Sequence, residues 1–257
     1  MSAPPPAAGP SGEVTVDLPT PARALAVAAH PDDIEFGCGA TLAKWAAAGC
    51  EVHHLVCTDG SKGTWDPHQD LPDLVLQRQA EQRSAAKALG ATGEVVFLGW
   101  PDGELDSGLR QRWQIAYWIR RLRPTVVLGH DPWKRYRLHP DHRHAGFLTV
   151  DGVVAARDPH FFPEQQIVHH RPEALLLFEA DERNHVEAVS EADVARKLAA
   201  LEAHDSQMRS TMHVELDTPE AEAQLAAFRQ RVRDRLADHG AVAGLPLGEA
   251  YAAITDL

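Results

Sequence analysis

The sequence predicts an α/β fold: a single domain with a Rossmann-like, mostly parallel sheet and helices on both faces. Apolar, strand-like runs alternate with helix-like segments through the first half of the chain. A β-α-β-α order implies parallel strands joined by crossover helices. The 257 residues are 44% apolar, which suffices for one large core, and neither an internal repeat nor a linker divides the chain.

The first half of the chain contains the clearest elements. Two of its helices are expected to end at Gly49 and Gly90, because glycine readily adopts the left-handed conformation that closes a helix. The expected strands are residues 23–29, 51–57, 94–98 and 125–128, and the expected helices are residues 39–48, 71–89 and 109–122.

The second half is predicted less completely. We expect a helix over residues 142–156, a strand over 174–178 and a helix that begins at Ser190, with Asp193 at capping-box spacing. A last helix should begin near Thr218 and end at Gly240. Its apolar residues recur at helical spacing and should pack on the core. They are Leu225, Phe228, Val232 and Leu236.

Composition bears on partners and location. The net charge of −12 and the lack of a basic face argue against nucleic acid as a partner. No apolar run reaches the roughly 18–20 residues that span a bilayer, and no secretory signal is visible, so we expect a cytoplasmic protein without integral membrane association. Cys38, Cys50 and Cys57 fit reduced, buried thiols. The Pro-rich residues 1–14 should be a disordered extension of a domain over 15–257.

Two adjacent acids follow the first expected strand. His30, Asp32 and Asp33 come directly after the apolar run that ends at Ala29. Ligands of parallel α/β sheets bind beyond the carboxyl ends of the strands. Neighbouring carboxylates repel each other and are costly to bury unless a cation lies near. A divalent metal ion bound here would compensate them.

A second polar cluster, His139-Pro140-Asp141-His142, follows the fourth expected strand. If the two strands are neighbours, both clusters face one pocket. Two histidines and one carboxylate form a three-ligand set with an open position, which is typical of catalytic zinc sites. The same set would accept iron, manganese or cobalt. His130 ends this strand and would either support a ligand or lie in a turn.

These segments resemble the LmbE-like family of metal-dependent de-N-acetylases, which includes the GlcNAc-phosphatidylinositol deacetylases. The resemblance covers roughly residues 23–207 and leaves out the tail after Met208. It is carried by AHPDDIEFGCGATLAKWAAAGCEV at 29–52, CTDGSKG at 57–63, an Arg-x-x-Glu at Arg78 and Glu81, FLGWPDGEL at 97–105, the HPDH motif and KLAALEAHDSQ at 197–207.

The resemblance implies a zinc ion (Zn²⁺) bound by His30, Asp33 and His142. It also implies that Asp32 is the general base of the reaction. The products would then be acetate and a free amine.

The other roles concern the transition state and the substrate. The resemblance implies that His139 stabilises the oxyanion, that Asp141 pairs with His139 and keeps it protonated, and that Arg78 contacts the substrate. Trp65, in the loop after the second strand, would either stack on a sugar ring at the pocket mouth or pack locally.

The predicted function is removal of an N-acetyl or other N-acyl group from a small-molecule amino sugar, such as an N-acetylglucosamine conjugate. The first alternative is a metal-dependent phosphoesterase, which would usually hold two metal ions. The second is a metal-holding module without catalysis, although such a module would need neither Asp32 nor His139. The identity of the conjugate and a homo-oligomeric state are left open.

Overall fold

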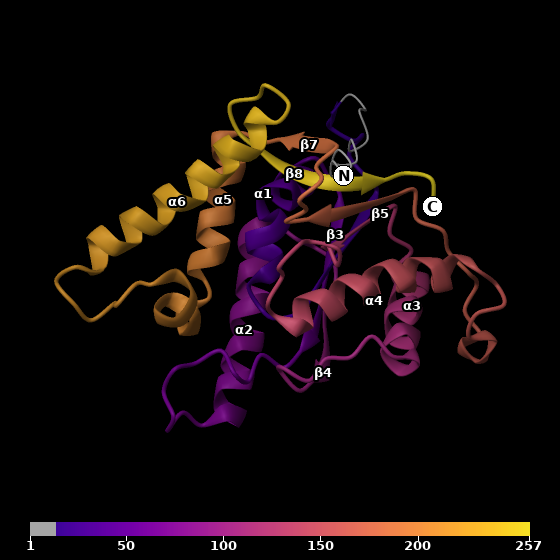
Figure 1. The fold of residues 1–257 in the computed structure, drawn as a ribbon, viewed down its shortest axis with the longest axis horizontal. Coiled ribbons are helices and arrows are strands. Elements are labelled where there is room, and N and C mark those ends of the chain that lie inside the picture. The colour runs from indigo at the N-terminus through magenta and orange to yellow at the C-terminus, as the bar shows by residue number, and fades with distance from the viewer. Residues whose placement is uncertain (1–13) are drawn as a thin grey trace, which may run out of the picture.

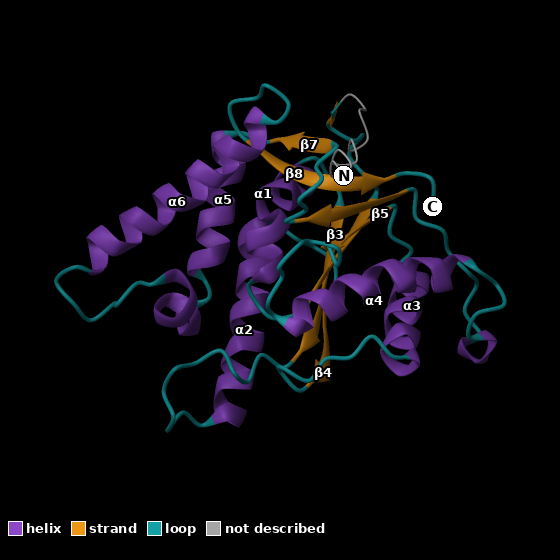
Figure 2. Cartoon of the chain, viewed as in Figure 1, coloured by secondary structure: helices purple, strands orange, loops and turns teal. Residues whose placement is uncertain are grey.

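The computed structural model describes residues 14–257 and has one eight-stranded sheet between layers of helices (Figures 1 and 2). The strand order is β1-β7-β8-β6-β5-β2-β3-β4. Only β8 pairs antiparallel with its neighbours, β6 and β7, so the predicted mostly parallel α/β sheet is confirmed. The extension expected to be disordered lies, up to residue 13, outside the described residues.

The elements follow one another in alternating order through most of the chain. The strands are β1 (Thr15–Val16), β2 (Arg23–Ala28), β3 (Glu51–Thr58), β4 (Val95–Trp100), β5 (Val126–His130), β6 (Ala174–Phe178), β7 (His185–Ala188) and β8 (Gly248–Ile254). The helices are α1 (Asp33–Ala47), α2 (Leu71–Leu89), α3 (Leu109–Leu122), α4 (Pro140–Arg157), α5 (Glu191–Glu202) and α6 (Ala221–Ala241), with short turns η1 (Pro163–Gln165), η2 (Asp205–Gln207) and η3 (Met208–Met212).

Strand β2 lies at the centre of the parallel region, between β3 and β5. Its side chains alternate between the two faces: Leu25 and Val27 pack in the core under α3 and α4, whereas Ala24 and Ala26 pack in the core under α1. Because β2 and β5 are hydrogen-bonded neighbours, the two polar clusters that follow them emerge side by side. The sequence predicted that both clusters face one pocket if these two strands are neighbours, and the sheet order meets this condition.

Helix α1 begins at Asp33, six residues before the predicted start at residue 39. The prediction was wrong because Gly37 and Gly39 are poor helix formers that obscure the first turn. The helix is interrupted at Cys38, whose φ of −147° and ψ of 17° are not helical. The early start places the first turn of α1 directly beside the acids.

A buried ion pair between Lys197 of α5 and Glu249 of β8 stabilises the interruption of α1. The Glu249 carboxylate accepts hydrogen bonds from the backbone N–H groups of Ala40 (3.1 Å) and Thr41 (2.7 Å). Lys197 of α5 donates to Glu249 at 2.6 Å and to the Phe36 carbonyl at 2.8 Å. This contact supplies partners for backbone groups that the interruption would leave unpaired.

The tail after Met208 is part of the core. Its strand β8 enters the sheet between β6 and β7, and Phe228, Val232 and Leu236 of α6 are buried, as predicted from their spacing. Strands β1, β7 and β8 were not predicted, since their short, small or polar sequences carry no strand periodicity of their own.

Two further expectations concern the cysteines and the absence of a membrane-spanning helix. Cys38, Cys50 and Cys57 are buried free thiols, as predicted. Among the helices of residues 14–257, none is long and apolar enough to span a bilayer.

We expect Lys197→Met to destabilise the protein by about 3–5 kcal/mol, because it leaves the Glu249 carboxylate buried without its cation. The matched control is Arg229→Met, which removes an exposed Arg229–Glu202 pair on neighbouring helices and should cost at most about 1 kcal/mol. Urea unfolding of both variants measures the difference. Equal losses would contradict a stabilising role for the buried pair.

Candidate metal centre

A hollow of about 380 Å³ lies where β2 and β5 end and where α1 and α4 begin. Loops after β3 and β4, the first half of α2 and η3 complete its walls. Seven of the eight predicted site residues line it, and Asp141 is the exception. The seven are His30, Asp32, Asp33, Trp65, Arg78, His139 and His142.

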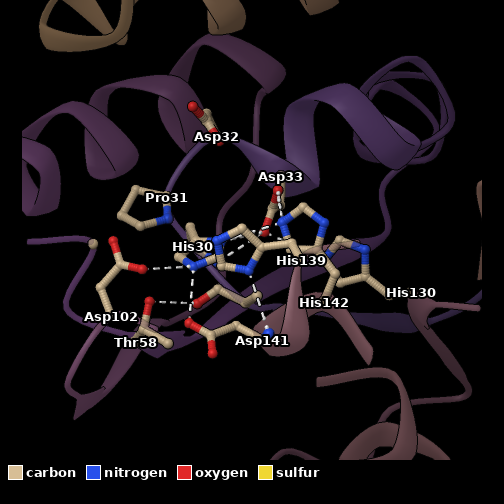
Figure 3. A network of polar contacts seen from close by, with 12 residues as sticks. His30, Pro31, Asp32, Asp33, Thr58, Asp102, His130, His139, Asp141 and His142 are labelled. Atoms are coloured by element: carbon tan, nitrogen blue, oxygen red, sulfur yellow. Dashed lines mark hydrogen bonds and ion pairs between the residues drawn. The ribbon is translucent and has the colours of Figure 1, made fainter. Parts of the chain in front are cut away.

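Three of these side chains converge on one point (Figure 3). His30 Nδ1 lies 3.3 Å from Asp33 Oδ2 and 3.2 Å from His142 Nε2, and His142 Nε2 lies 3.2 Å from Asp33 Oδ1. Ligand atoms held about 2.0–2.1 Å from a tetrahedral zinc ion are about 3.3 Å apart. The three residues therefore have the chemistry of such a site and pairwise distances near its spacing, with Asp33 facing His30 through Oδ2 and His142 through Oδ1.

Local structure fixes Asp33. The backbone N–H of His30 donates to Asp33 Oδ2 at 2.8 Å, and His130 Nε2 lies 3.3 Å from the same oxygen. Burial alone would raise the pKa of Asp33, but His142 and His130 hold this pKa well below its usual range. The carboxylate is thus kept ionised at the start of α1, where a negative charge is also favoured by the helix dipole.

The other nitrogen of His30 faces two carboxylates. His30 Nε2 lies 3.1 Å from both Asp102 and Asp141. A carboxylate at one ring nitrogen holds the proton there and leaves the other nitrogen free to bind a metal. Burial opposes ionisation of His30, but these carboxylates and Asp33 raise its pKa well above the usual value.

The predicted pairing of Asp141 with His139 is wrong. The Asp141 carboxylate contacts His30 and accepts hydrogen bonds from the backbone N–H groups of Gly103 (2.6 Å) and Leu105 (3.2 Å). These partners lie on the loop after β4, which the sequence did not place beside α4. Asp141 therefore supports a candidate metal ligand from outside the hollow.

His139 caps α4 with its ring. Its Nδ1 accepts a hydrogen bond from the backbone N–H of Asp141 at 3.3 Å, which assigns the ring proton to Nε2. The ring centre lies 4.6 Å from that of His30 and 4.9 Å from that of His142. Burial, together with His30 and His142, lowers the pKa of His139. The Asp141 and Asp102 carboxylates act in the opposite direction and raise the pKa of His139, as was expected of Asp141, but burial and the two histidines outweigh them.

Asp32 stands apart from this cluster and directs its carboxylate away from the imidazole rings (Figure 3). It precedes α1 with a left-handed φ of 89°, which is strained for a residue other than glycine. Its N–H donates to Gln82 Oε1 at 3.0 Å, and Arg78 lies 3.7 Å from its carboxylate. Burial raises the pKa of Asp32 to about 6, although Arg78 opposes this effect.

Arg78 is buried and binds backbone carbonyls. It donates to Gly60 and Pro31, both at 2.7 Å, and so ties the loop after β3 to the turn before Asp32. A Cβ atom at Gly63 would clash with the Arg78 guanidinium group, so a larger residue here would displace Arg78 from these carbonyls. Trp65 is 82% exposed on the rim of the hollow, so it is free to meet a ligand rather than packed locally.

Several supporting residues were not assigned from the sequence. The His130 ring stacks on His142 with centres 4.5 Å apart, so His130 supports the candidate ligands rather than a turn alone. Asp102 lies within the matched segment 97–105, which was a usable signal. For Gln82, the only signal in the sequence was its position four residues after Arg78, on the same face of α2.

A buried polar cluster holds Gln82 in place. Its amide nitrogen donates to Glu35 at 2.7 Å, and His204 lies 3.3 Å from the other oxygen of Glu35. Gln207, from the segment of the family resemblance that contains His204, donates to the Gly63 carbonyl at 3.0 Å. Gln207 lines the hollow, and the contacts of Gln82, Glu35 and His204 support it from within the protein.

This chain is similar to known deacetylases in both sequence and structure. A family model described as GlcNAc-PI de-N-acetylase (PIG-L) matches residues 25–153. Diacetylchitobiose deacetylase from Thermococcus kodakarensis is 36% identical over 188 residues, which cover 72% of this chain and 70% of the relative.

A second relative and a solved structure extend the comparison. The 1D-myo-inositol 2-acetamido-2-deoxy-alpha-D-glucopyranoside deacetylase from Streptomyces avermitilis is 36% identical over 173 residues, but the match spans only 58% of either chain. The structure of N,N'-diacetylchitobiose deacetylase from Pyrococcus horikoshii has a TM-score of 0.80 and 26% identity, and the match covers 91% of this chain and 84% of that one.

We expect the protein to bind about one zinc ion per chain and the His142→Ala variant to lose it, since only two of the three converging donors would remain. His144→Ala is the matched control, because His144 lies on the same helix and bonds to Ser107. Elemental analysis after dialysis gives the metal content of each protein. Full zinc content in His142→Ala would contradict the assignment.

We expect Gln82→Leu to destabilise the protein by about 1–3 kcal/mol, because it leaves the Asp32 N–H buried without an acceptor. Gln79→Leu, on the same helix, has no side-chain hydrogen bond to lose among the described residues and should be nearly neutral. Thermal unfolding compares the two variants. A similar effect of both would show that Gln82 does not hold this turn.

Proposed function

This chain belongs to the GlcNAc-PI de-N-acetylase (PIG-L, LmbE-like) family, a family of deacetylases, and from that premise we propose that it is a zinc-dependent hydrolase. Its proposed reaction removes an N-acetyl group from a small-molecule amino sugar or amino-sugar conjugate. The observation that carries this proposal is the convergence of His30, Asp33 and His142 within 3.3 Å of one another beside the buried Asp32.

The pKa values of the adjacent acids suit different tasks. The pKa of Asp33 is held well below its usual range, which suits a permanent metal ligand, and that of Asp32 is raised to about 6, which suits a group that accepts and releases a proton near neutral pH. Bound zinc would lower the pKa of a water molecule to about 7 and polarise the acyl carbonyl.

We assign the proton transfers to Asp32. Its carboxylate would take the proton of the attacking water and return it to the nitrogen of the departing amine. His139 would donate from Nε2–H to the oxygen of the acyl group as negative charge develops there.

The names of the relatives support an amino-sugar substrate. The T. kodakarensis and S. avermitilis proteins are named as deacetylases of diacetylchitobiose and of an acetamido-glucopyranoside. A hollow of about 380 Å³ accommodates a ligand of one or two sugar rings, and the exposed Trp65 offers an aromatic face to a ring. Arg78 would act by holding the loop at Gly60.

The proposal also includes the identity of the metal ion and the location of the protein in the cell. Zinc is preferred for a set of two histidines and one carboxylate, which would also take iron, manganese or cobalt. A cytoplasmic location is supported by three buried cysteines that remain free thiols.

The zinc-loaded protein should release acetate from at least one member of a panel of N-acetylglucosamine conjugates. Asp32→Asn should keep its zinc and lose about 10²–10⁴-fold in turnover, because the proton acceptor is gone. His139→Ala should lose about 10²–10³-fold, the usual effect of removing an oxyanion donor.

Three outcomes would count against this mechanism. Undiminished turnover in Asp32→Asn would remove Asp32 as the base. Phosphate release with two metal ions per chain would favour the phosphoesterase alternative, and the absence of any product from a protein with one zinc per chain would favour a non-catalytic module.

A further inference from the structure

A second hollow, here called the α6 pocket, adjoins the candidate metal centre. Its volume is about 240 Å³. Phe36, Phe228 and Val232 supply its apolar walls, Arg231 and Arg235 supply guanidinium groups, and His213 supplies an imidazole. None of these residues has a role in the proposed reaction.

The α6 pocket lies within reach of a ligand held at the metal centre. Phe36 follows Asp33 by three residues, so it lies on the same face of α1 and about one turn, or about 5 Å, farther along the helix. Thr211 lines both hollows. On the opposite side, Arg235 lies 3.8 Å from Glu179, which accepts a hydrogen bond from Arg137 beside His130.

The charge of the α6 pocket is opposite to that of the chain. The net charge is −12, yet no acidic side chain lines this pocket among residues 14–257. Arg231 donates to the Met212 carbonyl at 2.8 Å and has no ion-pair partner in the described part of the chain. Arg231 and Arg235 are four residues apart on α6, a spacing at which like charges destabilise a helix.

The remaining charged groups at the α6 pocket do not cancel its excess of positive charge. Lys197 also lines the pocket, but Glu249 neutralises it. Asp234 and Asp238 of α6 line a separate, neighbouring hollow that Arg231 and Arg235 also border. Arg235 also lies 3.8 Å from Glu179, so among the described residues the unpaired positive charge at the α6 pocket belongs chiefly to Arg231.

We propose that the α6 pocket is a second substrate subsite, which binds a carboxylate or phosphate on the aglycone of the amino sugar. The aromatic and aliphatic walls would hold the apolar part of the aglycone, and Arg231, placed 5.8 Å over the Phe228 ring, would meet the anion with Arg235. The subsite deepens the proposed deacetylase function and rests on it.

A matched pair of substrates tests the subsite. The 4-carboxyphenyl and 4-carbamoylphenyl glycosides of N-acetylglucosamine have nearly the same shape and differ in charge. We expect the zinc-loaded protein to release acetate from the carboxylate with a kcat/KM about 10-fold higher, mostly through KM, because hydrogen bonds to charged groups are the stronger ones. Added salt should reduce this preference.

Variants of α6 identify the residues that cause the preference for the carboxylate glycoside. The Arg231→Gln, Arg235→Gln double variant should lower the ratio of the two kcat/KM values to about 1. Arg233→Gln is the control: Arg233 is on the same helix and pairs with Glu191, so its variant should keep the wild-type ratio. A ratio that survives in the double variant would mean that another group, such as Lys62 on the rim of the metal-centre hollow, reads the charge, and would overturn the subsite.

The remaining outcomes separate the two proposals. Acetate release from both glycosides with equal kcat/KM would overturn the subsite and leave the deacetylase function standing. A higher kcat/KM for the carbamoyl glycoside would point to an apolar occupant and would also overturn it. No acetate from these glycosides or from the wider panel would contradict the deacetylase function and the subsite together.

Discussion

Two adjacent carboxylates at the end of β2 impose the constraint around which this structure is organised. Asp32 and Asp33 are both removed from water, where each would be costly without compensation. The surroundings of the two carboxylates differ. Asp33 faces His30, His130 and His142, whereas Asp32 is turned away from these rings. The neighbouring acids thereby acquire different pKa values, which suit the proposed roles of a metal ligand and a proton acceptor.

Several distant parts of the chain serve this arrangement. The loop after β4 brings Asp102 to His30 and anchors Asp141, so that the ring of His30 is fixed from the side opposite the metal. Helix α2 supplies Arg78 and Gln82, which hold the strained turn at Asp32. A shift of any of these elements would change the separation of the candidate donor atoms, and the proposed tetrahedral zinc site would tolerate little such variation.

The C-terminal tail connects the stability of the fold with the shape of the active region. Glu249 on β8 binds the interrupted backbone of α1 and pairs with Lys197 on α5. Helix α6 packs on α5 through Phe228, Val232 and Leu236 and forms the outer wall of the α6 pocket. The same tail that completes the sheet therefore also forms a wall of the α6 pocket, which shares Thr211 with the candidate metal centre.

The sequence by itself determined the parallel α/β core, the helices at 71–89 and 109–122, and the candidate ligands His30, Asp33 and His142. These features are local: each depends on periodicity, on a helix-ending residue or on a short motif at the end of a strand. Only the folded chain shows that the Asp141 carboxylate bonds to His30, that α1 begins at Asp33, that β8 joins the sheet, that Gln82 holds the Asp32 N–H and that Arg231 lines the α6 pocket. Such contacts join residues far apart in the chain, and packing selects among partners that spacing cannot distinguish.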